Sequence, residues 1–186
     1  MNDHLSKISE IEAEHVLKAA PTRWDRQIAV DLIAEMETYL GQVNTIPEMR
    51  RVLAVAGYNG LRQRIENAVR GKSGPDALRA MAFAMRSYAL GSPGLAAASF
   101  RSADRDSPEW QEGGKDLART IFSVFAECGI EGERAQHAVR ILRSLVRGFI
   151  LNEMASSNSE PLEFQHSYVL AVNMFIDGLP ALEEAA

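Results

Sequence analysis

Two arginines, Arg143 and Arg147, stand beside Gly148 in the segment 140–153, which is otherwise mostly apolar and has helical spacing. A guanidinium group binds carboxylates and phosphates through paired hydrogen bonds, which is the chemistry of an anchor for an acidic ligand. Because an unpaired buried arginine is costly, an inward-pointing one requires such a ligand or a carboxylate of the chain, such as Glu153. Glycine is about 1 kcal/mol less favourable than alanine in a helix interior. Gly148 therefore marks either a close approach of another group or a glycine that a core helix tolerates.

Methionine and aromatic side chains recur on three of the predicted helices. Soft and aromatic surface of this kind suits an adaptable pocket for a small, mainly apolar ligand, although the same residues also suit an ordinary core. We expect the ligand site to comprise members of this set together with the two arginines, namely Met81, Met85, Tyr88, Phe122, Phe125, Arg143, Arg147 and Phe149.

Other chemistry has little support in the sequence. There is no glycine-rich phosphate loop, no Gly-x-Ser-x-Gly elbow and no His-Glu-x-x-His pair, and the four histidines are scattered. The single Cys128 cannot form an internal disulfide, and no cysteine or histidine spacing matches a zinc site. We therefore expect no metal, no cofactor and no enzymatic activity, and we interpret Cys128 as a buried structural thiol.

The composition, 46% hydrophobic and 24% charged over 186 residues, indicates one or two small domains with enough apolar material for a core. No apolar run approaches the ~20 residues needed to span a bilayer, and residues 1–20 lack the apolar stretch of a signal peptide. We expect a cytoplasmic protein with no membrane partner.

The net charge of −5 argues against broad affinity for nucleic acid, but the charge is unevenly distributed. Residues 50–72 contain six basic side chains and one acid, Glu66. Such a patch suits contact with phosphates, although an arginine-rich helix face is often simply solvated. The expected DNA contacts are Arg50, Arg51 and Arg62.

The elements that must position these side chains are helices, because apolar residues recur at three- and four-residue steps and no stretch alternates like a strand. The sequence thus predicts an all-α fold. Proline and glycine signals bound several helices, for example Gly74-Pro75 at a start and Gly129 after an end. The expected helices cover about 9–20, 24–40, 74–91, 107–128, 131–154 and 161–179. A short apolar, alanine-rich piece is expected at 95–100, and loops at 101–108 and 156–159.

The segment 140–153 also resembles a known signature. An arginine and two aliphatics precede Ser144, and an aliphatic pair, Gly148, Phe149 and Glu153 follow in order. This order is similar to the penultimate-helix signature of TetR-type transcriptional regulators of the WHG subgroup. Arg143 stands where that family usually has tryptophan, and Arg147 where it usually has histidine. Weaker matches in the same order lie at 57–62, 74–80, 88–95 and 175–179, so the resemblance covers residues 57–179.

The resemblance implies a TetR-like transcriptional regulator. Its ligand-binding and dimerisation domain would cover residues 57–186, and its partners would be a second copy, a small apolar ligand and operator DNA. The last two helices would form a four-helix interface with their symmetry mates. A row of apolar residues along the last helix, interpreted as exposed, independently supports such an interface. The expected interface residues are Leu145, Phe164, Tyr168, Val172 and Phe175.

Residues 1–56 lack the helix-turn-helix signature that the resemblance implies. The acids Asp31, Glu35 and Glu37 would repel a phosphate backbone if their helix faced DNA. This region is interpreted as a diverged DNA-binding domain, a substitute helical cap, an unrelated segment or the result of an upstream reading-frame shift. A local alternative places a helix-turn-helix at 45–65, with a turn at Ala56-Gly57. The alternative function is therefore a ligand-binding or partner-binding dimer of TetR-like fold that has lost DNA binding.

Overall fold

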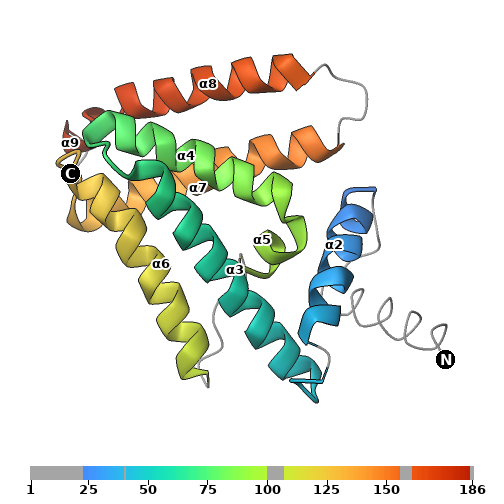
Figure 1. Cartoon of the computed structure of the whole chain (residues 1–186). Helices are drawn as coiled ribbons and strands as arrows, with labels where there is room; N and C mark the ends of the chain where they lie inside the picture. The colour runs from blue at the N-terminus through green and yellow to red at the C-terminus, as the bar shows by residue number, and fades with distance from the viewer. Residues whose placement is uncertain (1–22, 40, 100–106, 156–160, 185–186) are drawn as a thin grey trace. The chain divides into compact units, whose positions relative to one another are not determined.

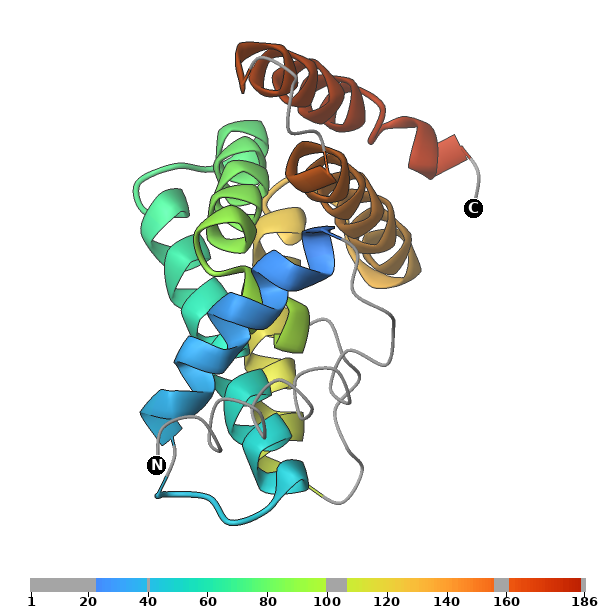
Figure 2. The same cartoon turned by 90° about the vertical axis from the view of Figure 1, so that its right-hand side faces the viewer.

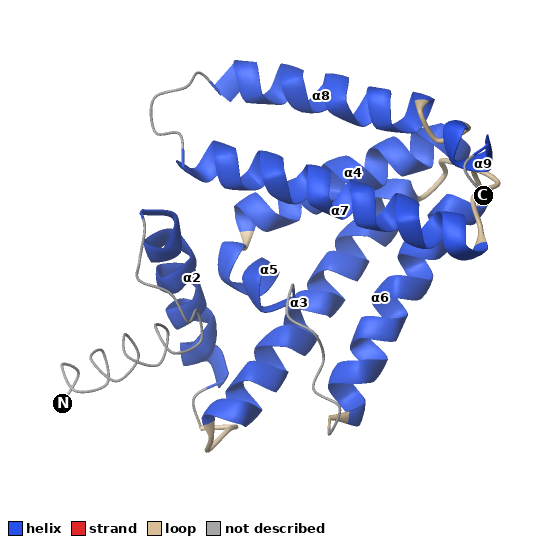
Figure 3. Ribbon diagram, turned by 180° about the vertical axis from the view of Figure 1, so that it is seen from behind, coloured by secondary structure: helices blue, strands red, loops and turns tan. Residues whose placement is uncertain are grey.

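The structure, a computed structural model, describes residues 23–39, 41–99, 107–155 and 161–184. Every regular element in these ranges is a helix (Figures 1 and 3), so the predicted all-α class is confirmed. The helices are α2 (Arg23–Tyr39), α3 (Ile46–Val69), α4 (Gly74–Gly91), α5 (Pro93–Ser99), α6 (Pro108–Ala126), α7 (Gly132–Ala155), α8 (Pro161–Asp177) and α9 (Ala181–Glu184). Neither the short helix α9 nor a continuous helix over the whole of α3 was predicted. The helix expected at 9–20 and most of the two expected loops lie outside the described residues.

Local sequence signals set the helix ends where they were predicted. Helix α6 begins at Pro108, and the Trp110 backbone N–H donates to the Ser107 hydroxyl at 3.4 Å. Gly129 follows α6 with a φ of +74°, the left-handed conformation that glycine adopts without strain. At the start of α3, the Glu48 carboxylate accepts from the Asn44 N–H at 2.9 Å. This hydrogen bond is the main cause of the lowered pKa of Glu48.

The chain forms two compact units. The first contains residues 1–60 and 91–115, and the second contains residues 61–90 and 116–186. Helices α3 and α6 therefore each contribute to both units. The domain boundary expected between residues 56 and 57 lies inside α3 and stays a prediction.

Within the first unit, α2 packs against α5 with close backbone contact (Figure 1). A Cβ atom added at Gly94 would lie 2.6 Å from the Leu32 backbone nitrogen, so the packing requires glycine there. The Gly94 N–H donates to the Asp31 carboxylate at 2.7 Å, which satisfies one free N–H at the start of α5. Apolar side chains from α2, α3 and α5 form the core, namely Leu32, Met36, Met49, Leu53 and Ala98.

Helix α3 runs without interruption through Ala56 and Gly57. The local helix-turn-helix interpretation of residues 45–65 is therefore wrong. Gly57 serves packing instead, because a Cβ atom there would lie 2.4 Å from the Leu95 carbonyl oxygen. The sequence signal was a real glycine requirement, but its cause is the close approach of α5 and not a turn.

In the second unit, α7 and α8 lie side by side and run in opposite directions (Figure 2). The core of this unit draws on α4, α6, α7 and α8. Its most deeply buried side chains include Leu78, Met81, Phe125, Ala138, Leu142 and Val172. None of the described helices is long and apolar enough to span a membrane.

Candidate functional site

Helix α7 turns Arg143 and Arg147 to the exposed side. The buried positions are Leu142, Val146 and Ile150, which recur at four-residue steps and face the core. Each arginine directly follows one of these positions and is therefore rotated about 100° away from the core. The expected inward charged anchor is thus wrong for both arginines in this chain.

Among the residues whose burial the structure describes, the buried arginine is Arg86, on α4, with 9% of its surface exposed. Its guanidinium holds the Glu153 carboxylate of α7 through two hydrogen bonds, from Nε at 2.9 Å and from Nη2 at 2.7 Å. A third bond runs from Nη1 to the Gln165 side-chain oxygen of α8, at 2.7 Å. Glu153 therefore has the arginine partner that we expected, but this partner is Arg86 and not Arg143 or Arg147. We call Arg86, Glu153 and Gln165 the arginine clamp.

The arginine clamp borders an aromatic cluster centred on Tyr168. The Arg86 guanidinium lies 5.1 Å from the Tyr168 ring centroid, and Phe83 and Phe149 pack edge-on against the same ring, each at 5.2 Å. The Tyr168 hydroxyl donates to the Ala82 carbonyl at 2.7 Å. Burial raises the pKa of Tyr168 above its usual value of about 10. Tyr168 therefore links α8 to α4 as a neutral hydrogen-bond donor.

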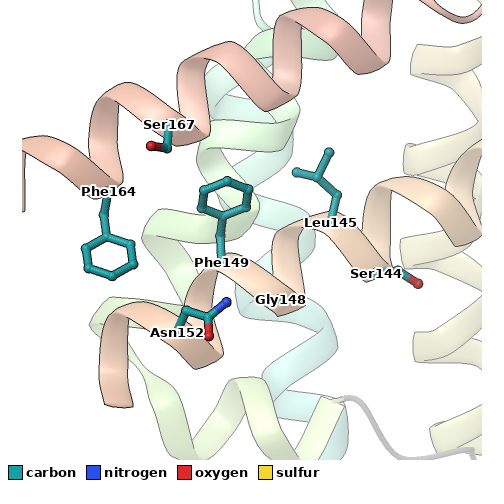
Figure 4. Close-up of a pocket in the computed structure, with 7 residues that line it drawn as sticks. All are labelled: Ser144, Leu145, Gly148, Phe149, Asn152, Phe164 and Ser167. Carbon is teal, nitrogen blue, oxygen red and sulfur yellow. The ribbon is translucent and has the colours of Figure 1, made fainter. Parts of the chain in front are cut away.

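An open groove of about 460 Å³ lies between α7 and α8 (Figure 4). A Cβ atom added at Gly148 would meet nothing within 4 Å. No packing within the described part of the chain therefore requires glycine at this position. The groove is lined by Ser144, Leu145, Gly148, Phe149 and Asn152 of α7 and by Phe164 and Ser167 of α8.

The residues expected to bind a ligand occupy different environments. Phe149 lines the groove. Met81 and Phe125 are fully buried in the second unit, and Met85 and Tyr88 are nearly so. Phe122 is partly exposed, at 36%. The structure therefore brings the apolar members into one unit but not around one surface, and their role in ligand binding stays a prediction.

The row expected to be exposed on α8 is partly wrong. Tyr168 and Val172 are completely buried, because α8 turns the positions at four-residue steps toward the core. The expected interface residues Leu145, Phe164 and Phe175 are half-buried. The large exposed apolar side chains of these two helices are instead Ile141 on α7 and Leu170 and Met174 on α8, at 47%, 50% and 74%. Apolar periodicity in the sequence did not predict this outward row.

Residues 78–175 match the sequence model of the "Tetracyclin repressor-like, C-terminal domain" family. This span exceeds half of the chain and includes the arginine clamp, the aromatic cluster and the groove. The chain belongs to this TetR-type family. The resemblance expected from the segment 140–153 is thus confirmed, and the family is one of transcriptional regulators and not of enzymes.

A relative of this TetR-type protein is an uncharacterized HTH-type transcriptional regulator of Mycobacterium tuberculosis. The two sequences are 25% identical over 160 residues, which cover 81% of this chain and 73% of the relative. The matched share of this chain is more than residues 57–186 alone supply, so the similarity extends into the N-terminal region.

In this TetR-type chain the expected DNA-contact arginines are half-buried on α3. Arg51 Nε lies 3.7 Å from a Glu109 carboxylate oxygen. Arg62 Nη1 lies 3.6 Å from a Glu66 carboxylate oxygen, one helical turn away. Both pairs are partly exposed and therefore weak. A role of Arg50, Arg51 and Arg62 in DNA contact stays a prediction.

Proposed function

We propose that this protein is a TetR-type transcriptional regulator that dimerises through α7 and α8 and responds to a small, mainly apolar ligand. The observation that carries the proposal is the groove between α7 and α8 together with the outward row beside it. Large apolar patches without cover mark interaction sites in soluble proteins. In a family of regulators, a second copy is the partner that best suits such a surface.

The spacing of the exposed residues supports a single continuous face. On α7, Ile141, Ser144 and Gly148 follow one another at three- and four-residue steps, and on α8, Leu170 and Met174 do the same. A two-fold axis would place this face against its own copy. Helices of 24 and 17 residues are about 36 and 26 Å long, which suits the roughly 800 Å² per partner of a standard interface.

Sedimentation velocity at micromolar concentration tests the dimer. We expect the wild type to sediment as a dimer and Leu170→Glu/Met174→Glu to sediment as a monomer. The variant dimer would have to bury the two new glutamate carboxylates of each copy without partners. Val30→Glu is the matched control, since Val30 is 63% exposed on α2 and outside the proposed face. A monomeric wild type contradicts the proposal.

The ligand site is proposed for the interior of the second unit, where Met81 and Met85 provide polarisable, adaptable side chains near aromatic ones. The apolar dye anilinonaphthalene sulfonate serves as a probe. We expect saturable binding to the wild type and to Leu170→Glu/Met174→Glu, and weaker binding to Met85→Trp, which fills interior space. Binding that is lost only in the α8 variant would assign the probe to the outer face and contradict an interior site.

A second candidate, a dimer of this family without DNA binding, is favoured by α2. This helix is continuous over 17 residues, carries Asp31, Glu35 and Glu37, and connects to α3 through residues 40–45. That connection is longer than the three- or four-residue turn of a helix-turn-helix. The similarity of the N-terminal region to an HTH-type regulator supports the leading proposal instead.

A gel-shift assay with the DNA that flanks this protein's own gene separates the two candidates. The leading proposal expects a shift at low salt that weakens steeply as salt rises, since bound phosphates release counterions. Arg50→Ala/Arg51→Ala should weaken the shift, whereas Arg134→Ala, at the start of α7, should leave it unchanged. Absence of any shift at low salt supports the second candidate.

A further inference from the structure

Helix α6 carries two adjacent glycines, Gly113 and Gly114, in its interior. Glycine is a poor helix former because it loses more backbone freedom on folding than other residues. A Cβ atom at Gly113 would lie 3.5 Å from the nearest atom, and one at Gly114 would lie 3.6 Å away, in both cases from the Tyr58 ring. These are ordinary van der Waals distances. Alanine would therefore fit at either position.

Two other helical glycines of the first unit, Gly57 and Gly94, are in a different situation. A Cβ atom at Gly57 or Gly94 would lie within 2.6 Å of backbone atoms of a neighbouring helix, so packing excludes a side chain there. Close packing thus explains Gly57 and Gly94 but does not explain the pair in α6. Gly113 and Gly114 lower the stability of the helix, and no steric contact requires them. We therefore infer that they serve the flexibility of the helix.

The position of the pair supplies that reason. Helix α6 passes from the first compact unit into the second after Lys115, directly beyond Gly114. Helix α3 also belongs to both units, and it passes from one to the other after Gly60. Glycines thus stand at the crossing in both helices. Sharp bends in helices commonly occur at glycine pairs.

We propose that Gly113 and Gly114 form a flexible joint in α6, at which the helix bends where it leaves the first unit. This inference goes beyond the proposed function, because the joint requires neither a ligand nor DNA. A joint of this kind is a hinge in which a few residues absorb the change in backbone angles. It gives the two units a way to reorient without breaking either core.

Hydrogen exchange provides the first test. In Gly113→Ala/Gly114→Ala, the amides of residues 114–118 should exchange about tenfold more slowly than in the wild type, because local opening becomes less favourable. Ser87→Ala is the matched control, since it also introduces alanine at an open position in a helix interior but lies within one unit, away from the groove and the proposed dimer face. It should leave exchange in α6 unchanged. Equal exchange rates in the wild type and the double variant overturn the joint.

A distance measurement separates a joint from a helix that is merely stabilised. Spin labels at Thr38→Cys and Ser123→Cys, in a Cys128→Ser background, report on one unit each. Dilution with unlabelled chain isolates distances within one protomer. We expect a broad distance distribution that becomes narrower in Gly113→Ala/Gly114→Ala and keeps its width in Ser87→Ala. A width that the two alanines leave unchanged overturns the joint, even if exchange slows.

Discussion

Arg86 of α4 holds Glu153 of α7 through two parallel hydrogen bonds, at 2.9 and 2.7 Å, and the same guanidinium donates to Gln165 of α8. One side chain therefore connects three helices of the second unit. The side chains of Arg86 and Glu153 are 11% and 21% exposed, so water screens their attraction only partly. The structure satisfies both charges, and the removal of either leaves the other poorly solvated.

Glu153→Gln should lower the free energy of unfolding by about 3 kcal/mol, because Arg86 would keep its charge without a carboxylate. Urea unfolding followed by circular dichroism measures this change. Glu112→Gln removes a carboxylate from an exposed pair with Lys115 and should change stability by less than about 0.5 kcal/mol. The double variant Arg86→Met/Glu153→Leu should recover most of the loss. An unchanged urea midpoint in Glu153→Gln contradicts the clamp.

Tyr168→Phe should reduce stability by about 1 kcal/mol at neutral pH, because the hydrogen bond to the Ala82 carbonyl is lost. Burial raises the pKa of Tyr168, so the folded state retains the phenol proton more tightly than the unfolded state does. The stability that depends on this proton is complete below about pH 10 and is lost as the pH rises further. Unfolding curves between pH 7 and 11 should therefore show a steeper alkaline decline in the wild type than in Tyr168→Phe. Parallel declines would contradict the buried, neutral phenol.

Gly94→Ala should destabilise the first unit by about 2 kcal/mol, because the new methyl group would meet the Leu32 backbone at 2.6 Å. Gly113→Ala, by contrast, should raise stability by up to about 1 kcal/mol, since its methyl group has room. Thermal unfolding of the two variants compares them directly. A Gly94→Ala variant as stable as the wild type would show that α2 and α5 do not pack closely.

Glu35→Gln should raise the melting temperature at pH 7. The expected rise is only about 1–2 °C, because Glu35 is only slightly buried and solvent screens its charge. Burial, and then the charge of Asp31, raise the pKa of Glu35. The folded state therefore binds the proton of Glu35 more tightly than the unfolded state, and its charged form destabilises the fold at neutral pH. The advantage of glutamine should disappear below about pH 4, where the wild-type carboxyl is protonated. A difference in melting temperature between Glu35→Gln and the wild type that is the same at pH 7 and below pH 4 would contradict this explanation.

Short-range signals made the helix ends predictable. Gly74-Pro75, Ser107-Pro108 and Gly129 act through their own backbone angles and nearest hydrogen bonds, so their effect does not depend on the rest of the fold. The family resemblance of the segment 140–153 was also recognisable, because it rests on residue order within one helix.

Side-chain direction was less predictable where a helix is apolar on several sides. Helix α8 has Tyr168, Leu170, Val172 and Met174 in close succession, so periodicity alone does not decide which of them face the core. The packing of α8 on α4 and α7 decides it. Arg86 was missed for a related reason, although it is the sole charged residue in 80–91. Its partners come from helices that are distant in sequence.

The arginine clamp joins positions that are 67 and 79 residues apart in the chain. It forms only after α4, α7 and α8 have come together, because the chain must lose the entropy of closing such long loops before the contact can contribute free energy. Interactions that are absent from the folding transition state act mainly on the unfolding rate. The clamp therefore sets how long the folded second unit persists, while the speed at which that unit folds depends on its local helices.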